Sequence, residues 1–328
     1  MADTVRATIV QAIVQAMRLE MQADPTVLVL GEDVGKDGGV FRATDGLFEE
    51  FGPNRVMDTP IAESGIAGAS VGLALGGFRP VAEMQFMGFI YPATNQILSH
   101  IARYRWRTRG RHKMPVVVRM PYGGGIHAPE HHSESYETLY SHSPGLQVVV
   151  PSTPYDAKGL LISAIRSDDP VLFMEPKRIY RAFREEIPTD AYTVPIGKAK
   201  VVREGTDITL VSYGAMMRET LKAADSLKAD GVSAEVIDLR TIMPMDTETV
   251  INSVKNTGRC VVIHEATAFS SISSEIIAQI NEKALLNLLA PVGRVTGYDT
   301  PMPLAKTEMT YLPSEKRILK AVRDALEF

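Results

Sequence analysis

The chain lacks the sequence features that define several common classes of protein. It contains a single cysteine among 328 residues, which excludes an internal disulfide framework and a cysteine-based metal cluster. Its formal net charge is −4, so no general attraction to nucleic acid or anionic lipid is expected. No stretch reaches the about 18 consecutive apolar residues of a membrane span, and no secretory signal pattern opens the chain. We therefore expect a cytoplasmic protein with no membrane partner.

Two nucleotide-binding motifs are also missing. The chain has no G-x-x-x-x-G-K-[ST] loop and no G-x-G-x-x-G between a strand and a helix, so neither a Walker-type nor a Rossmann-type site is supported. The one basic run, "RYRWRTRGRHK" at 103–113, has interleaved aromatic residues that nucleic-acid binding would use. In an acidic chain such a run more often lies on the solvated or partner-facing side of a helix end. We expect no nucleic-acid partner.

What is present is a regular alternation of short apolar runs and helical patterns. The runs include "TVLVLGEDV", "RPVAEMQF", "MPVVVRMP" and "PVLFMEP", and helical patterns lie between them, one of them over 91–105. This order predicts an α/β fold with a parallel sheet flanked by helices. Residues 182–205 interrupt the pattern with charges, proline and glycine, and a second α/β pattern follows. We predict two domains, 1–190 and 191–328.

The stretch "DTPIAESGIAGASVGLALGG", residues 58–77, is nearly all small or apolar but carries one carboxylate, Glu63. A first-turn glutamate after Pro60 would be favoured by the helix dipole, which is a purely structural explanation. The glycines and alanines that follow permit close approach of another backbone, a neighbouring subunit or a flat ligand. In such a water-poor setting a carboxylate suits proton exchange with a ligand nitrogen.

Three further residues are candidates for the same site. Glu32 follows "TVLVLG" and so lies where a parallel strand ends, the edge at which ligands of open α/β sheets bind. An exposed loop carboxylate is the alternative. Phe86 and Phe89 are core aromatics by default, although one ring could form the floor of a pocket for a heteroaromatic ligand.

A histidine-rich loop is expected at residues 121–135, "PYGGGIHAPEHHSES". Three glycines make it flexible, and His127, His131 and His132 titrate near neutral pH, which favours an active-site loop. A metal site is the rival interpretation. Pro129 and the glycines argue against a helix, however, and no H-E-x-x-H is present.

Four stretches carry a resemblance to a known family: "LGEDVGKDGGVFRAT", "DTPIAESGIAGASVGLALGGFRPVAEMQF", "STPYDAKGLLISAIR" and "GRCVVIHEA". Together they resemble the beta subunit of the thiamin-diphosphate-dependent decarboxylase component of 2-oxo acid dehydrogenase complexes. The likeness runs from the first helix to the C-terminus. It implies a pyrimidine-binding parallel-sheet domain followed by a transketolase-type C-terminal α/β domain, working with an alpha subunit in an alpha2-beta2 heterotetramer.

The resemblance implies roles for single residues around thiamin diphosphate. Glu63 would hydrogen-bond the N1′ nitrogen of the pyrimidine ring and drive formation of the reactive imino tautomer. Ile61 would meet the aminopyrimidine through its backbone, Gln85 would lie beside the cofactor, and Phe89 would cover the ring. Glu32 matches a second acidic residue on a proton path between paired active sites.

His132 matches the family's loop histidine near the thiazolium end of the cofactor. That histidine assists reductive acylation of the lipoyl group, which belongs to a lipoyl domain of the dihydrolipoyl acyltransferase core. The resemblance gives His127 and His131 no catalytic role, and we interpret them as loop residues.

The resemblance also concerns two metal ions. Some members hold a structural potassium ion near the positions of Ala164, Ser167 and Asp169, where the family usually has Asp in the middle and Asn last. Ser167 and Asp169 depart from that pattern. The Mg²⁺ that binds the cofactor's diphosphate needs a G-D-G…N motif, and this chain contains no "GDG". We expect the alpha subunit to hold that ion.

These features predict an enzyme subunit that, with its alpha partner, oxidatively decarboxylates a 2-oxo acid on thiamin diphosphate and transfers the acyl group to a lipoyl domain. "FMEPKRIYR" and "HEATAFSSISSEI" look closer to branched-chain members, and pyruvate is the alternative substrate. A catalytically silent scaffold homologue is a rival hypothesis. The joint presence of Glu63, Phe89 and His132 argues against it.

Overall fold

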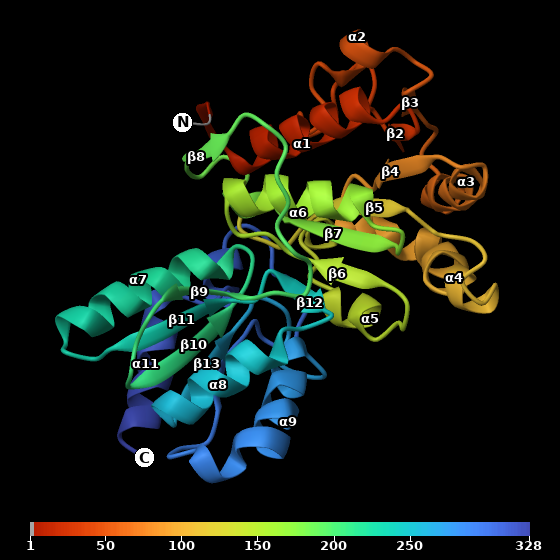
Figure 1. Cartoon of the computed structure of the whole chain (residues 1–328). Coiled ribbons are helices and arrows are strands. Elements are labelled where there is room, and N and C mark those ends of the chain that lie inside the picture. The colour runs from red at the N-terminus through yellow and green to blue at the C-terminus, as the bar shows by residue number, and fades with distance from the viewer. Residues whose placement is uncertain (1–2) are drawn as a thin grey trace. The chain divides into compact units, whose positions relative to one another are not determined.

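The computed structural model describes residues 3–328 (Figure 1). The chain divides into two compact units. Residues up to Tyr122 and Leu139–Ile196 form the first unit, and Gly123–Thr138 and Gly197–Phe328 form the second. The change of unit after Ile196 falls inside the predicted boundary stretch 182–205. The segment Gly123–Thr138 differs from the prediction, because it clusters with the second unit although residues 1–190 were assigned to the first domain.

The first unit is built on a parallel sheet. Its strands run in the order β6 (Gln147–Val149), β7 (Val171–Pro176), β5 (Val117–Tyr122), β4 (Arg79–Glu83), β2 (Val27–Gly31) and β3 (Val56–Asp58). The longer helices are α1 (Ile9–Ala23), α3 (Glu63–Leu75) and α6 (Pro154–Arg166). Shorter elements are β1 (Thr4–Ala7) paired with β8 (Glu185–Pro188), α2 (Leu47–Phe51), η4 (Lys177–Ile179) and α5 (Glu137–Ser141).

Local sequence signals explain where α1 and α6 begin. Thr8 and Gln11 form a reciprocal capping box at the start of α1, which satisfies two amide groups that the helix leaves unpaired. Thr153 caps α6, and Pro154 occupies its first position, where no amide hydrogen is needed. The two helices pack against each other, and a bidentate pair between Arg166 and Glu20, at 2.8 and 2.9 Å, joins them.

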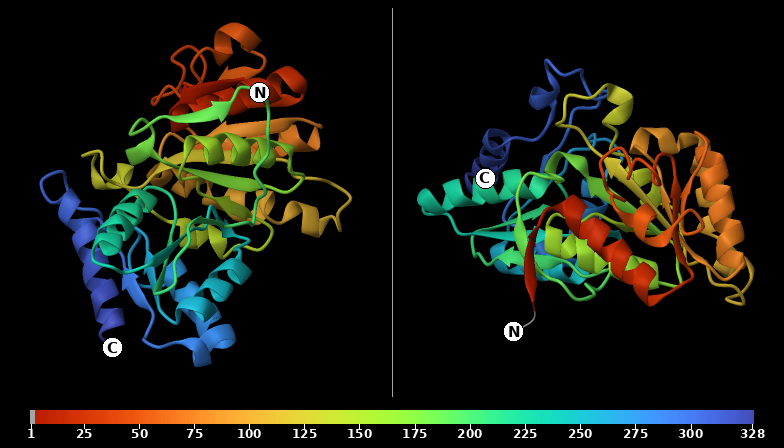
Figure 2. Two further views of the ribbon diagram at one scale, coloured as in Figure 1. Left: turned by 60° about the vertical axis from the view of Figure 1, so that its left-hand side comes forward. Right: turned by 90° about the horizontal axis from the view of Figure 1, so that it is seen from above.

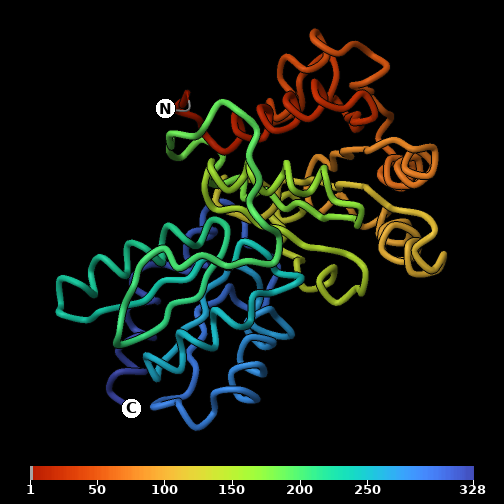
Figure 3. Tube along the Cα trace, viewed as in Figure 1, coloured from red at the N-terminus to blue at the C-terminus, as the bar shows by residue number. Residues whose placement is uncertain are grey.

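The helix predicted over 91–105 is replaced by three short elements. They are the 3-10 helix η1 (Met87–Ala93), the π-helical η2 (Gln96–Ile101) and α4 (Tyr104–Arg107). Pro92 lies inside η1. Proline in the first turn of a helix costs no hydrogen bond, so Pro92 does not account for the division of the later residues into η2 and α4. Figure 3 traces the path after β4.

The second unit has a five-stranded sheet with the order β14 (Gly293–Val295), β13 (Cys260–Ile263), β10 (Ile208–Ser212), β11 (Ala234–Asp238) and β9 (Lys200–Arg203). Only β9 pairs antiparallel to its neighbour. Helix α7 (Met216–Ala229) packs against α11 (Glu315–Leu326), as Figure 2 shows, and α8 (Thr247–Thr257) packs against α9 (Ile272–Ala284). The remaining elements are η3 (Glu130–His132), β12 (Thr241–Met243), η5 (Leu285–Asn287) and α10 (Glu308–Tyr311). No helix in residues 3–328 is long and apolar enough to cross a membrane.

Candidate active site

Carboxylates gather at the carboxyl end of the first unit's sheet. Glu32 directly follows β2, Glu83 ends β4, and Glu63 begins α3. The strands β2 and β4 are neighbours, with Gly31 opposite Glu83, so Glu32 and Glu83 belong to the same edge. Glu32 is 5% exposed, and its Oε1 atom has no hydrogen-bond partner among the described residues. A buried carboxylate oxygen without a partner is costly, which marks this position as prepared for a group outside the chain.

The carboxylates act on one another electrostatically. Burial raises the pKa of Glu32, and the nearby charges of Glu63, Asp33 and Glu83 raise it further. Burial also raises the pKa of Glu83, although the guanidinium of Arg119 opposes that shift. Repulsion between neighbouring carboxylates favours the protonated form of one of them. The edge can therefore hold a proton on Glu32 at a pH where an isolated glutamate would lose it.

Glu63 lies in a different environment from the one that its sequence neighbourhood suggests. It is only half-buried, and Ile61, two residues earlier, is 85% exposed. Much of α3 is open to solvent, because only Ile66, Ala67, Ser70 and Ala74 are buried. The expected close-packed surroundings of Glu63 are therefore not supplied by the described part of this chain.

Aromatic rings and one amide complete this edge. The ring of Phe89 packs edge-on against Phe86 at 5.2 Å between centroids, and Phe86 packs in the same way against Phe41 at 5.4 Å. Phe86 is buried and Phe89 is half-buried, so Phe89 offers part of its surface. Gln85 donates a hydrogen bond from Nε2 to Asp33 Oδ2 at 2.9 Å. The structure thus places Gln85 and Phe89 on the segment that leaves β4, the strand beside β2.

A buried ionic network beneath this edge was not predicted from the sequence. Arg119, fully buried in β5, donates to both carboxylate oxygens of Glu175, at 2.7 and 2.8 Å. Its third contact is a short hydrogen bond to Glu83. The hydroxyl of Tyr180 donates to the same Glu175 carboxylate. One guanidinium thus faces two carboxylates, which explains how the charges are tolerated in the core.

The sequence did contain a signal for this network. Glu83 and Glu175 lie near the carboxyl ends of apolar strands, and Arg119 is the single charged residue within β5. Buried charges are normally paired, and neighbouring parallel strands bring their ends together. Charges of opposite sign in three apolar strands would therefore have indicated buried ion pairs, although not which residues form them.

The histidine loop belongs to the second unit and is held there by Glu308. The backbone amides of Gly125 and His127 donate to the two carboxylate oxygens of this buried residue, at 2.7 and 2.9 Å. The His127 ring lies 3.0 Å from the same carboxylate. His132 is half-buried in η3, and His131 is exposed. His127 is thus an anchored loop residue, while His132 has a partly open ring.

A pocket of about 400 Å³ lies beside this loop in the second unit. Its walls include Glu134, Tyr136, Glu265, Phe269, Asp299 and Tyr311. Among the described residues, no three His, Cys, Asp or Glu side chains come together in a way that would hold a metal ion.

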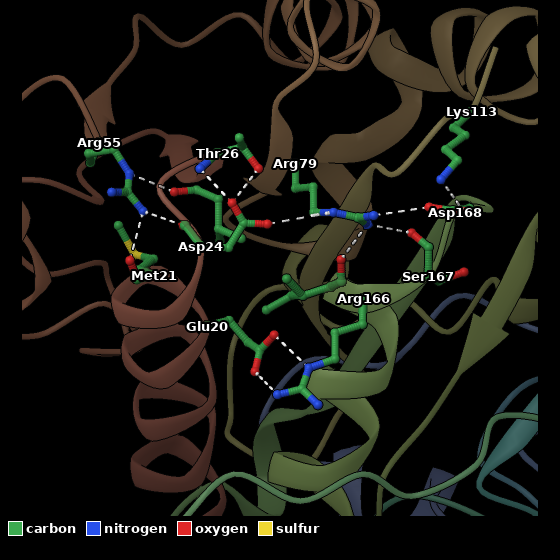
Figure 4. Close-up of polar contacts among 12 residues, drawn as sticks. Glu20, Met21, Asp24, Thr26, Arg55, Arg79, Lys113, Arg166, Ser167 and Asp168 are labelled. Carbon is green, nitrogen blue, oxygen red and sulfur yellow. Dashed lines mark hydrogen bonds and ion pairs between the residues drawn. The ribbon is translucent and has the colours of Figure 1, made fainter.

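The three positions predicted to bind potassium already have partners, and Figure 4 shows the contact of Ser167 with Arg79. The carbonyl oxygen of Ser167 accepts a hydrogen bond from Arg79 Nη1 at 2.9 Å, and Asp169 forms an ion pair with Arg105 at 2.7 Å. The carbonyl of Ala164 accepts from the Ser167 amide at 3.2 Å. No atom here calls for an added cation, so potassium stays a prediction and no step below depends on it.

The residues at the sheet edge do fit an organic cofactor. They offer a buried carboxylate oxygen in need of a donor, a second carboxylate at a helix start, and a partly open aromatic ring. That combination suits a heteroaromatic ring with its own hydrogen-bond donors. The chain provides no glycine-rich diphosphate motif to go with it.

Comparisons with known proteins agree with this organisation. Residues 6–182 match the family model described as the transketolase pyrimidine-binding domain, and residues 197–318 match the transketolase C-terminal domain. The chain is 54% identical over 321 residues to the pyruvate dehydrogenase E1 component subunit beta of Bacillus subtilis, covering 98% of this chain and 99% of the relative. The subunit of the same name from Staphylococcus aureus is 51% identical over the same coverage.

A solved structure is similar in fold. It is described as a split-gene transketolase, inactive beta4 tetramer, and it aligns with a TM-score of 0.79 and 23% identity over 98% of both chains. At this identity the likeness concerns the fold alone.

Proposed function

The chain belongs to the beta subunits of thiamin-diphosphate-dependent 2-oxo acid dehydrogenases, and from that premise we propose that it forms half of an enzyme that oxidatively decarboxylates pyruvate. The observation that carries this proposal is the carboxylate pair Glu32 and Glu63 at the ligand-binding edge of a sheet whose chain lacks a diphosphate motif. Such an edge is half of a cofactor site.

Pyruvate is favoured over branched-chain 2-oxo acids by the relatives. The subunits from Bacillus subtilis and Staphylococcus aureus, both above 50% identity over nearly the whole chain, are named for pyruvate dehydrogenase. The branched-chain preference rested on two short stretches, whereas these matches extend over 321 residues. We therefore propose pyruvate as the substrate.

The proposal assigns each residue of the edge a task. When bound, thiamin diphosphate supplies the thiazolium carbon at which 2-oxo acids are decarboxylated. Glu63 accepts and returns a proton at the pyrimidine N1′ nitrogen, and the backbone of Ile61 and the ring of Phe89 orient that pyrimidine. Glu32 holds a proton at the same edge, since its raised pKa keeps it protonated over a wider pH range. Gln85, hydrogen-bonded to Asp33, positions this wall.

Other chains complete the proposed enzyme. An alpha subunit provides the Mg²⁺ and diphosphate half of the site, in an alpha2-beta2 heterotetramer. The acyl group leaves on a lipoyl domain of a dihydrolipoyl acyltransferase core. His132, half-buried in η3, is the residue of this chain proposed to assist that transfer.

Calorimetry with magnesium tests the proposal directly. Thiamin diphosphate should bind tightly to the chain reconstituted with its alpha subunit and weakly to the chain alone. The reconstituted enzyme should then show a kcat/KM for pyruvate about tenfold or more above that for 3-methyl-2-oxobutanoate. Equal affinity of the chain alone would refute the split site. A cofactor-loaded complex that turns over neither acid would instead identify a silent scaffold.

A further inference from the structure

A strongly basic pocket lies on the first unit, away from the carboxylates described above. Its volume is about 540 Å³. It is lined by β1, the first turns of α1 and two loop segments, with one acidic residue, Asp45. We call it the arginine pocket, after Arg6, Arg18, Arg42, Arg181 and Arg184. Because the whole chain carries a net charge of −4, this concentration of positive charge is a local feature.

Three of the five guanidinium groups have no carboxylate partner within residues 3–328. Arg181 donates to the carbonyl oxygen of Phe41 at 2.6 Å, and Arg184 donates to the carbonyl of Arg6 and to Gln11 Oε1, at 3.2 and 3.0 Å. The side chain of Arg6 makes no hydrogen bond or ion pair within residues 3–328. Neutral oxygens hold Arg181 and Arg184 in place but leave their charges uncompensated.

The other two arginines are only partly neutralised. Arg18 pairs with Glu50 at 2.7 Å. Arg42 lies 4.0 Å from Asp45, and both side chains are largely exposed, so that pair is weak. The pocket therefore keeps a net positive charge that an anionic ligand can neutralise.

The geometry selects among anionic ligands. Arg6 lies on β1, Arg18 on α1 and Arg42 in the loop before α2, and the segment before β8 supplies Arg181 and Arg184. The positive charges thus come from four segments of the chain, more than a single phosphate requires. The lining includes Val5, Val10 and Val14 but no aromatic ring on which a nucleobase could stack. Several guanidinium groups in a pocket that also has an apolar lining suit a peptide that carries several carboxylates.

The pocket is linked to the cofactor edge through Phe41. Its carbonyl is held by Arg181, its ring packs against Phe86 and Tyr180, both at 5.4 Å, and Phe86 contacts Phe89. A chain that completes the cofactor site beside Phe89 can therefore extend to the arginine pocket. We propose that the arginine pocket binds an acidic segment of the alpha subunit, an inference that rests on the proposed function.

The test compares two triple variants of equal charge change. One removes the unpaired charges of the pocket, as Arg6→Gln, Arg181→Gln and Arg184→Gln. The control removes three exposed charges on helices of the second unit, as Lys228→Gln, Lys255→Gln and Lys320→Gln. Assembly with the alpha subunit is followed by sedimentation at several salt concentrations. We expect the pocket variant to assemble about tenfold or more weakly and with a shallower salt dependence, and the control to stay within about twofold of the wild type.

Several results would overturn the inference. A folded pocket variant that binds the alpha subunit with wild-type affinity would do so and would leave the proposed function intact. The single variant Arg6→Gln removes no contact within residues 3–328, so a weaker assembly of this variant would not be due to misfolding. Inorganic phosphate or ATP that stabilises the wild type but not the pocket variant, with assembly unchanged, would identify a small-anion site instead. A wild-type chain that does not associate with the alpha subunit at all would refute both proposals.

Discussion

Helices α3 and α6 have the same length, but the more apolar of the two, α3, is the less buried. The 13 residues of α3 are small or apolar except for Glu63 and two serines, yet only four are buried. The 13 residues of α6 include Asp156, Lys158 and Arg166, yet ten are buried. Lys158 donates to the carbonyl oxygens of Pro188 and Thr189, which makes its burial tolerable. An apolar helix left open indicates that its neighbour lies outside this chain.

The glycines of the two helices differ in the same way. A Cβ atom added to Gly159 in α6 would lie 2.5 Å from Val194 and 2.8 Å from Tyr192. A Cβ atom added to Gly72 in α3 would meet nothing within 4 Å. Gly159 therefore permits close packing inside the unit, whereas nothing in residues 3–328 requires glycine at position 72. The comparison separates a helix that stabilises the fold from one that serves the assembled enzyme.

The largest expected effect is on catalysis, at the first residue of α3. Glu63→Gln should lower kcat of the reconstituted enzyme by about 100-fold or more, because proton transfer by a positioned carboxylate is worth about that much. Its melting temperature should stay close to that of the wild type, since the side chain is half-exposed. Glu49→Gln is the matched control, being another first-turn glutamate, in α2. A similar loss of stability in both variants, with activity retained, would reduce Glu63 to a helix-dipole role.

The second prediction concerns the open face of α3. Gly72→Leu should leave the isolated chain folded, because the added side chain meets no atom of it nearby. It should block or strongly weaken assembly with the alpha subunit, by placing bulk where another chain is expected to pack closely. Sedimentation of the mixture measures this effect. Normal assembly of Gly72→Leu would show that the face stays exposed in the enzyme.

The third prediction is that replacing glycine by alanine changes the stability of the chain in opposite directions in the two helices. Gly159→Ala should lower the free energy of unfolding by about 1–3 kcal/mol, because the methyl group overlaps neighbouring side chains. Gly72→Ala should raise it by about 0.5–1 kcal/mol, the usual gain from replacing glycine in a helix. Urea unfolding of both variants measures the difference. Equal changes in the free energy of unfolding would show that Gly159 is no more closely packed than Gly72.

The contrast between α3 and α6 shows what sequence patterns determine. Alternating apolar runs predicted the parallel sheet, and the capping residues Thr8 and Thr153 are readable in the sequence at the starts of α1 and α6. The start of α3 at Glu63 was also predicted. An apolar sequence indicates that a helix surface is buried in the functional protein, but it does not indicate whether the same chain or another chain covers that surface. For that reason the sequence did not determine which chain or ligand encloses Glu63.

Other features depend on contacts between distant segments. The Arg119 network needs the strand order, which no local pattern contains. The attachment of the histidine loop to the second unit depends on Glu308, about 180 residues later in the chain.

The smallest expected effect is the pH dependence of stability at Glu32, the buried counterpart of Glu63. Its folded-state pKa is raised above the ordinary value of 4.5, so folding favours the protonated form. That contribution is fully present below pH 4.5 and is lost as the pH rises through the higher folded-state pKa. Glu32→Gln, which cannot ionise, should therefore gain stability relative to the wild type between pH 4.5 and neutrality, by about 1.4 kcal/mol for each unit of pKa shift.

Urea unfolding of the chain without cofactor at pH 5 and pH 7.5 measures this gain, with Glu49→Gln as the exposed control. The difference between Glu32→Gln and the wild type should grow with pH, while the control should show no such trend. A constant difference would mean that Glu32 is ionised at little cost. The same substitution should lower turnover in the assembled enzyme, because the proton held at this edge is lost. Stability gained together with activity lost would show that Glu32, like the open face of α3, is kept for the assembled enzyme rather than for the fold of this chain.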